Sequence, residues 1–283
     1  MMARFSKFTF FVLCTITSAF PTTSVNATEE VAIPPDYTAI YQVFRNDKNI
    51  AGVTIRLSHQ DDIWTLHGYT HDMRGLANFL RIKGAQTTTG TWIDGKFIPE
   101  DYKFSFSLIG YKTDWHADFD WSSGLVTTHG KAGDTQLPLA DNAVDPFSLS
   151  LNIRSQLARN RTQMSVSIID ESEIDNQMYE ADLEEPVDTA LGCLETTRVR
   201  RIRENSKRTS MAWYANDYNY VPVLMQHSKK NGNDFRLKII SLDVNGLVVP
   251  PVSPCGPENP GPRQAGLNQA SEKSTLRVYG QEH

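Results

Sequence analysis

The stretch "DWHADFDW", residues Asp114–Trp121, decides the fold class, because apolar and polar residues alternate along it. In an extended strand, successive side chains point to opposite faces. One face of this strand would carry Trp115, Ala117, Phe119 and Trp121, and the other His116, Asp118 and Asp120. A helical period would mix the two sets, so the stretch predicts a β-strand with an aromatic face toward a core.

The same alternation recurs on both sides of this strand. Before it come "YTAIYQVF", "GVTIRLS", "IWTLHGYT" and "YKFSFSLIG", and after it come "MSVSIID", "MYEADLE", "CLETTRVRRIRE", "SMAWYA", "YVPVLMQ" and "DFRLKIISL". Short period-two segments separated by Gly, Asp or Asn predict antiparallel strands in a meander. Asp94-Gly95 and Asn231-Gly232 are hairpin signals, and we expect Pro99 to precede the next strand. In "SMAWYANDYNYVPVLMQ" we expect Asn216 and Asp217 to form a hairpin turn, with Trp213 and Tyr220 flanking it and packing across the two strands. We expect Pro222 at a sheet edge or a bulge.

One segment, "VDPFSLSLNIRSQLARN", breaks the alternation. Asp145 suits an N-cap, Pro146 suits the first helical position, and apolar residues follow at helical spacing. We expect a central helix over residues 146–159 within a single β-rich domain of residues 37–244. No repeat of fixed period is visible in the chain.

The N-terminal residues have the pattern of a secretory signal peptide. Arg4 and Lys7 precede an apolar run over residues 8–20, and small residues precede a cut expected after Ala27. The run is too short to span a bilayer, so we expect an exported protein, soluble or peripherally attached to the envelope, with a signal peptide at 1–27 and a linker at 28–36. A lipoprotein anchor at Cys14 is disfavoured, because Leu13 stands where a small residue is needed.

Residues 245–283 are rich in Pro, Gly and polar residues, which predicts a flexible tail. Without the signal peptide the chain keeps Cys193 and Cys255. In an oxidising compartment these two could pair; alternatively, Cys193 is buried and Cys255 belongs to the loose tail. The formal net charge of −5 argues against general nucleic-acid binding.

Several segments together resemble a family of exported bacterial proteins known as domain of unknown function 3108. They are "YQVFRNDKNIAGVTIRL", "GKFIPEDYKF", "DFDW", "VDPFSLSL" and "WYANDYNYVPVLMQHSKKNGNDFRLKIISL". The positions that match the family pattern are Gly95, Pro99, Asp145, Trp213, Asp217, Tyr220 and Pro222. The resemblance implies a mainly β protein of the periplasm, an antiparallel open barrel or strongly curved sheet, with no assigned activity. The two cysteines and the tail are not part of that pattern.

The polar face formed by His116, Asp118 and Asp120 is the best candidate for catalysis, because a histidine beside carboxylates can serve acid/base chemistry. Its structural alternative is the solvated face of an antiparallel sheet, and we favour that alternative. His67 and His71 could join His116 and Asp118 in a metal cluster only if their strands were neighbours, which a simple meander does not make them. HExxH, GxSxG and phosphate-loop motifs are absent from the sequence, so we predict no metal and no cofactor.

The run "TRVRRIRENSKR" gathers positive charge on an acidic protein. Its candidate binding residues are Arg198, Arg200, Arg201 and Arg203. They could meet lipid headgroups or another anionic ligand of the envelope. The alternative, which we favour, is an exposed hairpin whose charges protect a sheet edge from aggregation.

Two functions follow from these patterns. The first is a non-catalytic binding or scaffold protein of the envelope, with an amphipathic or lipid-like ligand on a concave aromatic face. The candidate contacts are Trp64, Trp92, Trp115, Phe119, Trp121 and Trp213. The alternative is an envelope hydrolase or carbohydrate-active enzyme that uses the carboxylates of residues 115–121. The protein partner is not indicated by any motif.

Overall fold

One sheet organises the part of the chain that the structure describes. The structure is a computed structural model, and it describes residues 32–131, 133–203, 207–230, 232 and 234–256. All of them belong to one of the two units into which the chain divides, Val31–His283. The expected signal peptide, the first part of the linker and the tail beyond residue 256 therefore lie outside the described residues.

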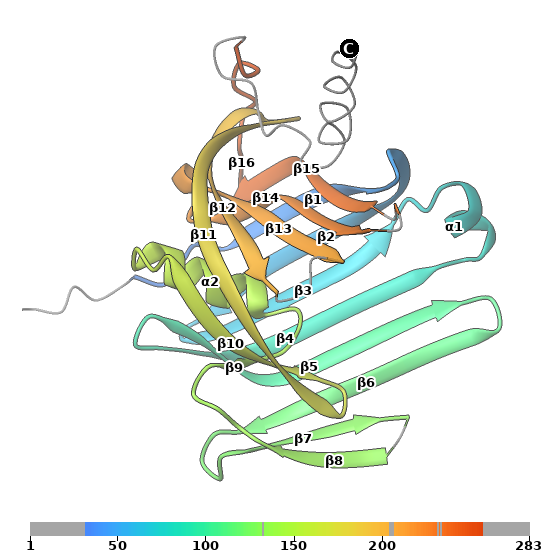
Figure 1. Cartoon of the computed structure of the whole chain (residues 1–283), viewed down its shortest axis with the longest axis vertical. Helices are drawn as coiled ribbons and strands as arrows, with labels where there is room; N and C mark the ends of the chain where they lie inside the picture. Colours follow the sequence, from blue (N-terminus) through green and yellow to red (C-terminus); the bar gives the residue numbers. More distant parts are fainter. Residues whose placement is uncertain (1–31, 132, 204–206, 231, 233, 257–283) are drawn as a thin grey trace, which may run out of the picture. The chain divides into compact units, whose positions relative to one another are not determined.

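The first half of the sheet is an antiparallel meander in which each strand pairs with the next along the chain (Figure 1). Its strands are β1 (Tyr37–Arg45), β2 (Lys48–Gln60), β3 (Ile63–His71), β4 (Lys83–Ile93), β5 (Lys96–Leu108), β6 (Tyr111–Asp120), β7 (Leu125–Gly130) and β8 (Gly133–Pro138). A short helix, α1 (Gly75–Phe79), connects β3 to β4. The sequence did not predict this helix.

The second half is also a meander, apart from one parallel pairing between its first two strands. Its strands are β9 (Ala143–Val144), β10 (Gln163–Asp170), β11 (Glu173–Thr189), β12 (Gly192–Ile202), β13 (Arg208–Ala215), β14 (Val221–Lys229), β15 (Asp234–Val244) and β16 (Leu247–Val248). The Asn231-Gly232 turn falls between β14 and β15, and Asn231 lies outside the described residues.

Pairing of β1 with β15 joins the two halves. The register runs from Tyr37 opposite Val244 to Arg45 opposite Phe235. The strand order then begins at β8 and ends at β9, so the described sheet curves without closing (Figure 1). The prediction of a mainly β fold, with an antiparallel, strongly curved sheet and a central helix, is confirmed.

The central helix, α2, spans Leu149–Ala158 and begins later than the expected residue 146. The carboxylate of Asp145 accepts hydrogen bonds from the backbone N–H groups of Phe147 and Ser148, at 2.8 and 2.9 Å. These bonds hold residues 146–148 in a turn, so Asp145 caps this turn and the helix follows it. Helix α2 contacts β5 and β10, one strand from each half of the sheet.

The turn at Asp94-Gly95 and the positions of Pro99 and Pro222 can be compared with what the sequence predicts. Asp94 and Gly95, with φ of 49° and 71°, form the tight turn between β4 and β5. Pro99 lies inside β5, at a register shift opposite Gly90, and not before the strand as expected. Pro222 is at the expected bulge, because the pairing of β13 with β14 shifts between Trp213 and Tyr214. A bulge accommodates a residue that has no N–H to donate.

The turn after β13 is a 3₁₀ helix, η1 (Asn216–Tyr218), which includes the predicted turn residue Asp217. Asn219 and Tyr220 follow it with φ of 49° and 57°. Trp213 belongs to the core under β1 and β15, whereas Tyr220 packs against a separate cluster that includes α2. Trp213 and Tyr220 flank this turn as expected, but the expectation that they pack together across the two strands is wrong.

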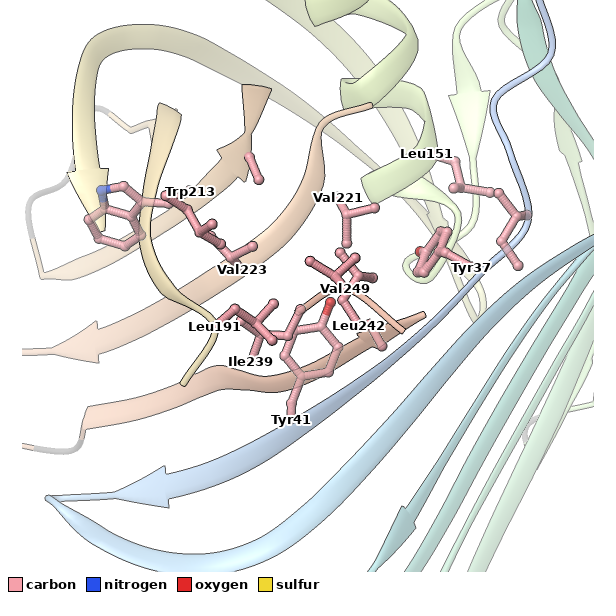
Figure 2. Packing of buried hydrophobic residues seen from close by; sticks show 14 of the residues in the cluster. Tyr37, Tyr41, Leu151, Leu191, Trp213, Val221, Val223, Ile239, Leu242 and Val249 are labelled. Carbon is pink, nitrogen blue, oxygen red and sulfur yellow. The ribbon is translucent and has the colours of Figure 1, made fainter. Parts of the chain in front are cut away.

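The main core lies where β1, β14 and β15 meet (Figure 2). Tyr41, Ile239 and Leu242 are fully buried there, and Val249 from the following segment packs onto them. The hydroxyl of Tyr41 donates to the carbonyl oxygen of Pro222 at 2.7 Å. This polar contact satisfies a phenol that burial removes from water.

The first part of the expected tail is attached to the sheet. Cys193 and Cys255 form a disulfide that spans 62 residues, so the pairing alternative holds in the structure. The N–H of Cys193 also donates to Ser253 O, and the N–H of Val252 donates to Leu191 O. Residues 249–255 are therefore fixed against β12, unlike the flexible tail that the sequence predicts.

Candidate ligand cavity and surface clusters

A cavity of about 590 Å³ lies between the two halves of the sheet, beside α2. Strands β2, β4 and β5 contribute to it from the first half, and β13, β14 and β15 from the second. Apolar side chains dominate its wall; examples are Ile55, Phe104, Phe106, Leu149, Met225 and Leu237. A volume of this size fits the usual range of ligand sites, roughly 300–1,000 Å³.

Three small residues on β3 and β4, Gly68, Gly84 and Ala85, form part of the wall, together with Tyr69, Thr70 and Gln86. A Cβ at Gly84 would approach Thr70 Cγ2 only to 3.4 Å, which is ordinary contact. A Cβ at Gly68 would instead meet the ring of Phe147.

One part of the wall is polar. Ser210 on β13 lies opposite His227 on β14, and Ser210 Oγ and His227 Nδ1 are 2.9 Å apart. Arg203 Nη1 donates to Ser210 Oγ at 3.2 Å. Burial lowers the pKa of His227, and the positive charges of Arg203 and Lys229 lower it further. Arg203 and Lys229 therefore place positive charge near this part of the cavity.

A buried arginine lies behind another part of the wall. Arg154 on α2 is 2% exposed, and its guanidinium carbon is 4.8 Å from the ring centre of Tyr37, which lines the cavity. Its Nε donates to Asn219 O at 2.9 Å, while Nη1 and Nη2 have no hydrogen-bond partner within the described residues. Burial lowers the pKa of Arg154, and the neighbouring phenol of Tyr37 opposes this shift.

The aromatic residues expected to contact a ligand are elsewhere. The lining of this cavity includes none of the following: Trp64, Trp92, Trp115, Phe119, Trp121 and Trp213. Trp64 and Trp213 are buried in the main core, with Trp92 against it, and the other three belong to the cluster around β6. The Nε1–H groups of Trp121 and Trp213 donate to Pro99 O and Glu185 Oε1, both at 2.7 Å. In the structure these residues pack the sheet.

Most of the arginine run is neutralised by carboxylates of β11. Arg198 binds Asp182 with two hydrogen bonds, at 2.9 and 3.1 Å. Arg200 pairs with Glu180 and Asp182, and Arg201 pairs with Asp175. Strand β12 lies between β11 and β13, so the explanation by a protected sheet edge is wrong. Arg203 differs, since its side chain points to Ser210 beside the cavity.

The polar face of β6 is as predicted, with Ala117 and Phe119 buried and Asp118 exposed. Asp120 accepts hydrogen bonds from Ser122 and Ser123, which lower its pKa to about 2. A carboxylate with so low a pKa is a poor general acid at neutral pH. Asp120 caps the turn between β6 and β7, and no observation here favours the hydrolase.

The structure adds a residue to this face that the sequence reasoning missed. His129 on β7 lies directly opposite His116, and their rings stack 4.3 Å apart. One donor atom from each of His116, Asp118 and His129 lies within 4.8 Å of the others. His67 and His71 are on β3, which β4 and β5 separate from β6, so they do not join the cluster. The hairpin signal at Ser122–Gly124 together with the alternation in "LVTTHG" could have placed His129.

Comparison with known families agrees with the resemblance seen in the sequence. A family model described as "Protein of unknown function (DUF3108)" matches residues 36–239. The chain belongs to this family. The DUF3108 match covers β1 through most of β15, which includes both halves of the sheet and the cavity between them.

No curated protein matches this DUF3108 member. Among solved structures it is similar to a β-barrel-like protein of domain of unknown function DUF1849 from Brucella abortus, at 11% identity and a TM-score of 0.49, over 75% of this chain and 99% of that chain. A putative lipoprotein from Parabacteroides distasonis matches at 9% identity and a TM-score of 0.27, over 75% of this chain and 97% of that chain. Within the described residues, none of the helices is long and apolar enough to cross a membrane.

Proposed function

We propose that the protein is a non-catalytic binding protein of the periplasm that holds an amphipathic, lipid-like ligand in the cavity between the sheet halves. The observation that carries the proposal is the cavity itself, about 590 Å³ in volume and mainly apolar, beside α2. Ligand sites in proteins are typically concave and mainly apolar with a few polar groups, and this cavity has that size and lining. The periplasmic location rests on the signal-peptide pattern of residues 1–27.

The shape of the wall supports a flexible apolar chain as the ligand. Met225 faces the space from β14, on the same face as Ala212 and His227, together with Phe104 and Phe106 from the opposite half of the sheet. Methionine side chains adapt their shape to a ligand, because they are unbranched and have several rotatable bonds. Such a wall favours an alkyl chain over a rigid polar ligand.

The polar part of the wall supports a negatively charged end group on this ligand. Ser210 and His227 offer hydrogen-bonding groups, and Arg203 lies 3.2 Å from Ser210 Oγ. Cationic side chains near an apolar cavity attract an anion more strongly than they would in open water, since the local dielectric constant is lower. A carboxylate or phosphate at this end would match the field that lowers the pKa of His227.

Native mass spectrometry of the untagged protein, purified without detergent from the periplasm of an expression host, tests the proposal. We expect the mass of one co-purified lipid per chain, which organic extraction then identifies. The variant Ala212→Trp should lose this mass, because Ala212 lines the cavity and a bulky ring there would fill it. The control Leu125→Trp adds the same ring on β7, at a position 37% exposed and outside the cavity, and should retain the lipid.

A second pair of variants tests the end group without filling the cavity. His227→Glu places a negative charge beside Ser210 and should weaken binding of a fluorescent fatty acid at least tenfold, whereas His227→Gln should change it much less. A wild-type protein that carries no lipid and shows no saturable binding of this probe would refute the proposal. Equal lipid occupancy in Ala212→Trp and wild type would place the ligand elsewhere and would also refute it.

A further inference from the structure

A cluster of donor atoms on the polar face of the β6–β7 hairpin is independent of the cavity. His116 and His129 are a cross-strand pair, and Asp118 follows His116 on the same face of β6. His129 Nε2 lies 3.4 Å and His116 Nε2 lies 3.7 Å from the same oxygen, Asp118 Oδ2. Three possible metal-ligand atoms, two imidazole nitrogens and one carboxylate oxygen, therefore lie close together on strands β6 and β7.

The hydrogen bond on the other side of His129 fixes which ring nitrogen faces this point. His129 Nδ1 lies 2.7 Å from Asp134 Oδ1 on β8. An ionised carboxylate can only accept, so Nδ1 carries the proton and donates it to Asp134. With Nδ1 as the donor to Asp134, Nε2 is the ring atom that faces Asp118 Oδ2, at 3.4 Å. A positive charge at this point, either a proton on Nε2 or a metal ion bound by both atoms, makes the approach favourable.

The spacing also suits a metal ion. Zinc ligands lie roughly 2.0–2.2 Å from the ion, so adjacent ligand atoms of a tetrahedral site are about 3.3–3.6 Å apart. The two measured separations from Asp118 Oδ2, 3.4 and 3.7 Å, are close to this range. A carboxylate bonded to the second nitrogen of a ligating histidine is the usual support for such a site, and Asp134 occupies that position.

A lysine of the neighbouring strand lies close to this cluster. Lys103, opposite His116 on β5, has its ammonium nitrogen 2.8 Å from Asp101 Oδ1 and also interacts electrostatically with Asp118. A hollow of about 420 Å³ lies beside two of the three residues, since its lining includes His116 and His129 but not Asp118. Side-chain exposures of 42%, 55% and 31% for His116, Asp118 and His129 make the site accessible from outside.

We propose that His116, Asp118 and His129 bind one divalent transition-metal ion of the zinc, copper and nickel class, with Asp134 orienting His129. Imidazole and carboxylate donors suit these metals, and a set of three protein ligands leaves at least one coordination position for water or a partner's side chain. The site is separate from the proposed ligand cavity.

Isothermal titration of the untagged, EDTA-treated protein with Zn²⁺ tests this site, and Co²⁺ absorption reports its geometry. We expect one ion per chain with micromolar affinity, and visible Co²⁺ bands of a four- or five-coordinate centre. His116→Ala and His129→Ala should weaken binding more than tenfold. Asp134→Asn removes no ligand and should weaken it by about 10–100-fold.

The matched control is His67→Ala, which removes an exposed histidine from β3 and should leave Zn²⁺ binding unchanged. Thermal unfolding of each apo variant shows whether the β6–β7 hairpin is intact. If an alanine variant unfolds, Asp134→Asn still tests the site, because it keeps all three proposed metal ligands. Absence of saturable Zn²⁺, Cu²⁺ and Ni²⁺ binding would overturn the proposal. Binding that is equally strong in His129→Ala and wild type would also overturn it.

Discussion

Gly68 on β3 lies against the ring of Phe147, so that a Cβ atom at Gly68 would be 2.6 Å from Phe147 Cζ. Phe147 belongs to the turn that leads into α2, and both residues line the cavity. The contact therefore sets how closely the central helix approaches the first half of the sheet.

Gly68→Ala should destabilise the protein by roughly 1–3 kcal/mol, because the added methyl group must displace a partly buried ring. Urea unfolding measures the loss. Gly84→Ala, also facing the cavity, is the control, and it should change stability by less than about 0.5 kcal/mol because its Cβ would meet only ordinary contacts. Combining Gly68→Ala with Phe147→Leu should restore part of the loss, whereas additive losses would contradict this contact.

Arg154→Met should leave the free energy of unfolding unchanged or raise it. The methionine keeps much of the side-chain volume and removes a buried charge whose terminal nitrogens lack partners within the described residues. Arg154→Ala should cost roughly 2–5 kcal/mol, because it leaves a cavity in the core. A loss from Arg154→Met as large as that from Arg154→Ala would show that the charge stabilises the fold.

Stability should fall as the pH decreases below about 6.5, in part because of His227. Its pKa in the folded protein is below the ordinary value of 6.5, mainly through burial. The unfolded chain therefore takes up this proton first as the pH falls, which favours unfolding until the pH passes the folded pKa. His227→Gln should reduce the stability difference between pH 8 and pH 5, measured by urea unfolding. The same substitution at the exposed His67 controls for the loss of a histidine.

Reduction of the Cys193–Cys255 disulfide should lower stability by about 4 kcal/mol, as expected on the chain-entropy model for a closed loop of 62 residues. Unfolding with and without dithiothreitol measures the effect. The double variant Cys193→Ser/Cys255→Ser should show the stability of the reduced wild type, both with and without dithiothreitol. A double variant as stable as the oxidised wild type would contradict the expected contribution.

The sequence predicted the elements better than their assembly. The alternation in residues 114–121 placed Ala117 and Phe119 in the core and Asp118 in solvent, as the structure has them. The bulge at Pro222 and the turn at Asp94-Gly95 also followed from local chemistry. These features depend on neighbours in the chain, which the sequence shows directly.

The candidate sites did not follow from local chemistry. Trp64 and Trp213 were expected on a binding face, yet they fill the core between strands. The arginines of β12 were interpreted as a binding patch or, preferably, as charges that protect a sheet edge, yet the carboxylates of β11 neutralise Arg198, Arg200 and Arg201. In both cases the outcome depends on which strand lies beside which, and on the register between them.

The sequence by itself determined that this protein is built of antiparallel strands, and which side chains share a face, because side-chain direction follows from the extended backbone. Only the tertiary structure decided what those faces meet. Pairing of β1 with β15 joins segments at opposite ends of the domain, and the cavity and the pairing of His116 with His129 depend on contacts between strands. Such contacts arise from packing and register over long separations, which local periodicity does not encode.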